Sequence, residues 1–124
     1  MVSEREWKWI GKAGHLIVGH DCVFHLCTVV GNKLISTVGD YHPYHKRGND
    51  GLGEAVTIGA GRLYETYVFR VNSPRIFCSC GCGLPDFDPT EIDSLPANAA
   101  GEATANHMAM CRKYAENQDA CPGD

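Results

Sequence analysis

Four cysteine and histidine side chains in the C-terminal third of the chain are spaced like the ligands of a zinc ion. Cys80 and Cys82 lie in a Cys-Gly-Cys-Gly turn, whose glycines let the backbone fold tightly around an ion. His107 and Cys111 are four residues apart, which places both side chains on one face of a helix. Three thiolates and one imidazole in tetrahedral geometry are typical of structural zinc, and four protein ligands leave no position for a catalytic water. The sequence therefore predicts a structural zinc site formed by Cys80, Cys82, His107 and Cys111.

Two alternatives to this ligand set stay open. The first half of a zinc site is usually Cys-x2-Cys, whereas this chain has Cys-x-Cys, and Cys78 could pair with Cys82 in place of Cys80. The other alternative is a turn of reduced thiols, with His107 and Cys111 packed in the core. Three thiols within five residues repel one another when ionised unless an ion holds them, which favours the metal.

A second candidate site is the segment 40–48, which combines histidine, tyrosine, lysine and arginine side chains. Basic side chains of this kind can bind a phosphate, and the aromatic rings can stack on a base. Arg62 follows a Gly-Ala-Gly segment whose backbone amides could add an anion contact. The alternative is a solvated loop next to an ordinary turn. The predicted ligand-binding residues are His42, His45, Lys46, Arg47 and Arg62.

No catalytic residue can be assigned from the sequence. The chain contains no nucleophile elbow, no metalloprotease helix motif and no Cys–His pair at a spacing typical of catalysis. A second metal site near His15, His20, Cys22 and His25 is disfavoured, because Cys22 and His25 would point to opposite faces of a strand. Trp7 and Trp9 are two residues apart and would share a strand face, as core residues or as a partner-binding patch. We therefore favour a binding protein over an enzyme.

Length and charge narrow the class of protein. The 124 residues fit a single domain spanning 1–124. The net charge of −4 is uneven, since residues 1–70 carry eight basic and seven acidic side chains and residues 71–124 carry three and eight. This balance makes nucleic acid an unlikely partner. We expect a cytoplasmic protein that does not bind a membrane. The reasons are the odd number of seven cysteines, the polar first residues and the absence of an apolar run of about 20 residues.

The elements that must position these residues follow from the apolar pattern. Residues 22–30 and 33–38 read as a hairpin around Gly31-Asn32, two residues that tolerate positive φ. Phe24, Leu26, Thr28 and Val30 share one face of its first strand. Further strands are expected at 7–10, 15–18, 55–58 and 63–71, and an irregular connection at 84–98.

A helix is expected over 99–116, with Asn98 as its N-cap. Its apolar stripe contains Ala100, Ala103, His107, Met110, Cys111 and Tyr114. The predicted fold class is therefore α+β, with an antiparallel β-sheet formed by the first 78 residues and a C-terminal helix pinned to it by the structural zinc site.

Several short motifs spread along the chain resemble a family of short uncharacterised proteins encoded by tailed phages and prophages. The resemblance rests on Trp7-Lys8-Trp9-Ile10, Gly14-His15, Phe24-His25-Leu26, Ser36-Thr37-Val38-Gly39-Asp40-Tyr41, Tyr64-Glu65-Thr66 with Val68-Phe69, Cys80-Gly81-Cys82-Gly83-Leu84-Pro85, and Gly101-Glu102-Ala103-Thr104 with His107 and Cys111. The family has no assigned activity, so the resemblance implies an origin and not a chemistry.

The resulting hypothesis is a phage or mobile-element accessory protein that acts as a zinc-stabilised binding module in the host cytoplasm. Its partner would be a host protein or a small anionic ligand. Inhibition of host defence would be one role of such a binding protein. The protein could also form a homo-oligomer. The first alternative is a small enzyme that acts on a phosphate-containing substrate through the residues of the second candidate site. The second alternative is a structural or assembly protein of the particle.

Overall fold

A computed structural model describes residues 2–10, 22–42, 57–58, 61–77 and 84–118. Its elements, in chain order, are η1 (Glu4–Glu6), β1 (Lys8–Ile10), β2 (Cys22–Val30), β3 (Lys33–Tyr41), β4 (Tyr64–Phe77), β5 (Pro85–Phe87), β6 (Asp93–Ala97) and α1 (Ala100–Glu116). The expected strand at 15–18 lies outside the described residues. Within the described residues, no helix is long and apolar enough to cross a lipid bilayer.

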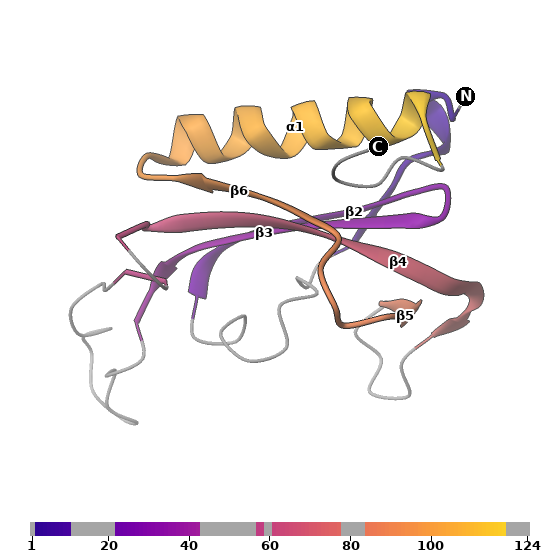
Figure 1. The fold of residues 1–124 in the computed structure, drawn as a ribbon, viewed down its shortest axis with the longest axis horizontal. Coiled ribbons are helices and arrows are strands. Elements are labelled where there is room, and N and C mark those ends of the chain that lie inside the picture. The colour runs from indigo at the N-terminus through magenta and orange to yellow at the C-terminus, as the bar shows by residue number, and fades with distance from the viewer. Residues whose placement is uncertain (1, 11–21, 43–56, 59–60, 78–83, 119–124) are drawn as a thin grey trace.

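All strand pairs are antiparallel, and the strands run β1-β2-β3-β4-β5 across the sheet, with β6 also paired to β4. The helix α1 lies along one face of this sheet (Figure 1). The predicted fold class, an antiparallel sheet followed by a C-terminal helix, is confirmed. The prediction that the first 78 residues form the whole sheet is wrong, because β5 and β6 belong to it.

The segment 84–98 was expected to be irregular because of its prolines, yet it forms two strands on β4. The first, β5, pairs with the later part of β4, and β6 pairs with its first part, from Tyr64 to Val68. Pro85 is the first residue of its strand, and β6 pairs with β4 alone among the described strands. Proline is tolerated at the first residue of a strand and on a strand with a single partner, because it does not remove a hydrogen bond from the interior of the sheet there.

The hairpin of β2 and β3 is confirmed around Gly31-Asn32, and β3 extends to Tyr41. Of the two turn residues only Gly31 has a positive φ, which is the pattern of a type II′ turn. Gln118, just past the helix, fixes this turn, since its Oε1 accepts the Asn32 amide at 2.6 Å and its Nε2 donates to the Val30 carbonyl at 3.1 Å. A Cβ on Gly31 would lie 1.9 Å from that Oε1, so a larger residue at this position would also displace the Gln118 side chain.

Side chains alternate between the two faces of the sheet, as the period of a strand requires. The face toward α1 holds the apolar cluster of Trp7, Val30, Ile35, Val68, Met110, Cys111, Tyr114 and Ala115. The other face holds a cluster of Cys27, Leu34, Phe69, Val71 and Leu84, and a smaller one of Cys22, Val38 and Ile58. Both faces of the sheet therefore contain buried apolar side chains.

The predicted helix is confirmed, but its N-cap is not Asn98. The N-cap is Ala99, which makes no side-chain cap, while the Asn98 side chain accepts the Leu63 amide at 3.0 Å. The predicted stripe is buried except for Ala100, which is exposed, and Ala115 extends it. Residues 55–56 of the expected strand at 55–58 lie outside the described residues. Thr57 and Ile58 are not in a strand, and the Ile58 amide donates to the Arg62 carbonyl at 2.7 Å.

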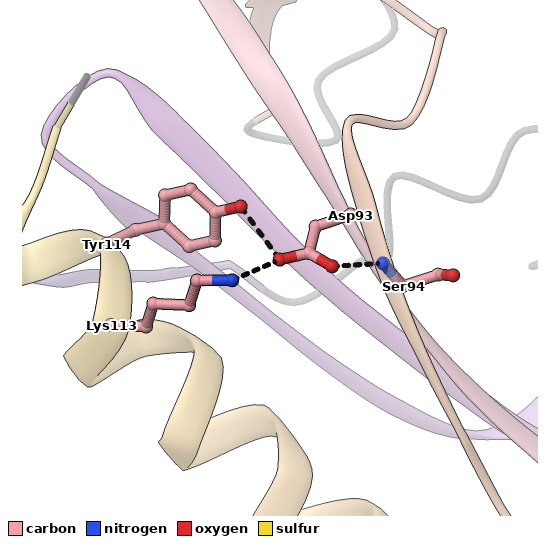
Figure 2. Close-up of polar contacts among 4 residues, drawn as sticks. All are labelled: Asp93, Ser94, Lys113 and Tyr114. Carbon is pink, nitrogen blue, oxygen red and sulfur yellow. Dashed lines mark hydrogen bonds and ion pairs between the residues drawn. The ribbon is translucent and has the colours of Figure 1, made fainter. Parts of the chain in front are cut away.

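A carboxylate at the start of β6 holds the C-terminal half of α1 (Figure 2). Asp93 Oδ2 accepts hydrogen bonds from Lys113 Nζ at 2.7 Å and from the Tyr114 hydroxyl at 2.8 Å, and Oδ1 accepts the Ser94 amide at 2.9 Å. Burial alone would raise the pKa of Asp93, but these hydrogen bonds and the charge of Lys113 outweigh it, and the pKa lies below its ordinary value.

Replacing Asp93 with asparagine should lower the free energy of unfolding by about 1–2 kcal/mol. An amide can satisfy either the two helix donors or the Ser94 amide with its one oxygen, so at least one partner is lost in each orientation. Urea denaturation at pH 7 measures the change. Asp88→Asn is the matched control, because Asp88 accepts only the nearby Thr90 amide on the surface, and it should change the value by less than about 0.5 kcal/mol. Equal effects of the two substitutions would contradict the role of Asp93.

Candidate functional site

The predicted zinc ligands His107 and Cys111 lie on the sheet-facing side of α1, in the middle of its contact with β2 and β3. Neither side chain has solvent-accessible surface. The His107 ring binds two threonine hydroxyls, with Nε2 2.8 Å from Thr28 Oγ1 and Nδ1 2.7 Å from Thr37 Oγ1. A third threonine continues the chain of hydrogen bonds, because Thr37 Oγ1 is 2.7 Å from Thr66 Oγ1. We call His107 and these three threonines the His107 layer.

Hydrogen-bond accounting shows that the His107 layer is complete with a neutral imidazole. A neutral ring has one N–H donor and one acceptor nitrogen, and each threonine hydroxyl can both donate and accept. With the proton on either nitrogen, one hydroxyl accepts from the ring and the other donates to it. No carboxylate joins the layer, so burial lowers the pKa of His107 to about 4.

Cys111 is a protonated thiol in this environment. Burial raises its pKa to about 12, and this effect is opposed by a hydrogen bond from Thr28 and by the charge of Arg112. A thiol of this kind is a poor nucleophile at neutral pH, because the thiolate is the reactive form.

The structure brings two of the four predicted zinc ligands together, and the other two, Cys80 and Cys82, lie outside the described residues, as does Cys78. Among the described residues, no group of three or more His, Cys, Asp or Glu side chains could hold a metal ion. Zinc at His107 would replace one threonine hydrogen bond and keep the other as the partner that orients the ring. Binding at Cys111 would also remove the thiol proton. The four-ligand zinc site therefore stays a prediction.

The predicted anion-binding residues that the structure describes are bound to neighbouring carboxylates. Arg62 Nε and Nη2 both lie 3.0 Å from Glu65 Oε2, and this glutamate is buried. His42 Nε2 is 2.8 Å from Asp40 Oδ1. Asp40 itself has a φ of 54°, the left-handed region that aspartate enters more readily than most residues. His45, Lys46 and Arg47 lie outside the described residues, so the predicted site stays untested as a whole.

The two tryptophans differ in exposure, although the sequence placed them on one strand face. Trp7 precedes β1 and is buried in the cluster beneath α1, whereas Trp9 on β1 is 52% exposed. The register pairs Trp9 with Thr28, so its ring lies on the helix face of the sheet. Its centroid is 5.6 Å from that of His107, with the two planes 32° apart. Trp9 is therefore an exposed aromatic side chain held on the edge of the His107 layer.

Sequence reasoning missed the partners of His107. The sequence places Thr28 on the face it occupies, together with Phe24, Leu26 and Val30. This pattern does not indicate that a histidine faces it. A threonine at each of three central strand positions was the available signal, because a buried hydroxyl requires a hydrogen-bond partner. The facing histidine supplies it.

The comparisons with known proteins give no further assignment, since no family model, curated protein or solved structure matches the chain.

The neutral state of His107 should make stability depend on pH between about 4 and 6.5. The unfolded chain binds a proton at this histidine below its ordinary pKa of 6.5, and the folded protein does so only near 4. The unfolded state therefore holds more protons in this window, and the free energy of unfolding falls as the pH falls, by about 3 kcal/mol in total. Urea denaturation across this range measures the slope. His107→Gln, which does not titrate, should remove this component, and an unchanged slope in that variant would contradict the assignment.

Proposed function

We propose that the protein is a small binding module of a phage or other mobile element, which docks a host protein through a surface centred on Trp9. The observation that carries the proposal is the exposed indole of Trp9 on β1, an outer strand of the described sheet. The mobile-element origin, and with it a place in the host cell, rests on the resemblance of the sequence motifs.

The setting of Trp9 suits an anchor in a protein interface. Tryptophan is enriched among the residues that dominate binding energy, because it buries a large area and has few rotatable bonds. Here the ring packs on His107, whose orientation two hydrogen bonds fix. A side chain that is already ordered loses less conformational entropy when a partner binds.

A protein partner is favoured over a small anion by the state of the described basic residues. Arg62 is paired with the buried Glu65, and His42 with Asp40. An incoming phosphate would have to replace these carboxylates and leave Glu65 buried without its counter-ion, which is costly. The same argument weighs against the alternative of an enzyme for a phosphate-containing substrate.

A structural zinc ion bound by Cys80, Cys82, His107 and Cys111 remains part of the proposal. The protein, purified without a chelator or a metal-affinity tag, should contain one zinc per chain by elemental analysis and native mass spectrometry. Cys111→Ala should abolish zinc binding and lower the melting temperature, because zinc bound by four ligands adds to the folding free energy. Cys27→Ala is the control, since Cys27 is buried on the opposite face of the sheet. Protein without zinc would refute the metal site.

Photo-cross-linking tests the docking surface. A photoreactive amino acid at position 9 should give a specific adduct with a host protein, whereas the same group at position 105, on the exposed side of α1, should not. An excess of the unlabelled chain should suppress the adduct, and an excess of the Trp9→Ala chain should not. The Trp9→Ala chain should keep its fold, because the side chain it loses is half exposed. Equal labelling from both positions would contradict the proposal, and an adduct with a virion component would support an assembly role instead.

A further inference from the structure

Helix α1 is held to the sheet unevenly along its length. In its C-terminal half, Met110, Cys111, Tyr114 and Ala115 belong to the main apolar cluster. Two sets of hydrogen bonds reinforce this half. The Asp93 carboxylate accepts from Lys113 and Tyr114 (Figure 2), and the Gln118 side chain bonds to the backbone of the β2–β3 turn. In residues 100–107, by contrast, only Ala103 and His107 are buried.

The local sequence of the N-terminal half does not compensate for this weak anchoring. The N-cap Ala99 leaves the first amides without a side-chain acceptor, so this end of the helix lacks the stabilisation that a capping residue gives. Gly101 in the first turn is a weaker helix former than alanine. Ala103 buries only a methyl group. The link to β6 is one hydrogen bond at the surface, from Asn106 Nδ2 to the Pro96 carbonyl at 3.2 Å.

The contact that remains in this half is the His107 layer, and it is polar. When helix and sheet separate, water can take the place of every hydrogen bond between His107 and the threonines. When apolar side chains separate, water does not replace the lost contacts, so the full free-energy cost of exposing apolar surface to water is incurred. Opening at the His107 layer is therefore less costly per contact than opening of the apolar cluster beneath residues 110–115.

We propose that residues 100–107 form a separate opening unit, which detaches from β2, β3 and β4 while the remainder of α1 stays docked. Parts of a protein with few buried apolar contacts open locally at a lower free energy than the whole. Detachment uncovers Thr37 and Thr66 and removes His107 from beneath Trp9. If the proposed function is correct, the state of this unit sets the shape of the Trp9 surface. The opening does not require a partner at Trp9, but it requires His107 to be free of zinc, because an ion shared with Cys111 would hold residue 107 to the docked half of the helix.

Native-state hydrogen exchange of the full chain, with any zinc removed by a chelator, tests the proposal. The informative amides are those of residues 104–108, which donate to the carbonyls of residues 100–104 and so exclude the ordinary fraying of the first turn. They should exchange together and at least tenfold faster than the amides of residues 112–116 and of β3. Equal protection of the two halves of α1 in the wild-type protein would overturn the proposal without any variant.

Thr37→Val sharpens the test, because valine has nearly the same shape and removes only the hydroxyl bound to His107 Nδ1. The closed state then buries an unpaired nitrogen that water can reach in the open state. Exchange of residues 104–108 should rise roughly tenfold to a hundredfold, the usual effect of an unsatisfied buried polar group, and exchange of 112–116 should rise much less. Asp93→Asn is the matched control and should affect mainly residues 112–116. A uniform rise across α1 in either variant would show a single cooperative unit and overturn the proposal.

Discussion

The two hydrogen bonds between His107 and the threonines of β2 and β3 are the constraint on which the arrangement of helix and sheet depends. They join the only helix that packs on the described sheet to its two central hairpin strands, at a point without solvent. Because a buried imidazole needs a donor and an acceptor at fixed directions, this contact sets the position of the helix along its axis more narrowly than apolar packing can. Thr66 on β4 joins this layer through its hydrogen bond to Thr37, and Trp9 on the outer strand packs against it.

The fold was predictable where local pattern and tertiary contacts agree. The hairpin at Gly31-Asn32 follows from strand alternation and turn chemistry, and the helix over 100–116 follows from its apolar stripe. The structure contains both elements. The strands β5 and β6 were missed because their residues carry weak strand propensity. Pairing with the long strand β4 overrides that propensity, and this pairing joins segments that the sequence does not show to be neighbours.

The candidate sites were less predictable, for a physical reason that differs from one residue to the next. His107 and Cys111 were identified by their spacing, but spacing does not reveal that threonines would face the ring. Arg62 was identified by its charge, and charge alone does not show that its guanidinium pairs with Glu65, near the start of β4. Trp7 and Trp9 both lie on the helix face of the sheet, and only packing distinguishes them, since Trp7 belongs to the apolar cluster with α1 whereas Trp9 is half exposed.

The position of α1 at the end of the described chain has a consequence for biosynthesis. All the strands leave the ribosome before the helix that covers them, so the helix-facing side of the sheet must meet water for a time. Had Thr28, Thr37 and Thr66 been valines, the centre of that side would be a continuous apolar strip of the kind through which nascent sheets associate. Until His107 packs on them, the hydroxyls of these threonines can be hydrated, and those of Thr37 and Thr66 can also bond to each other.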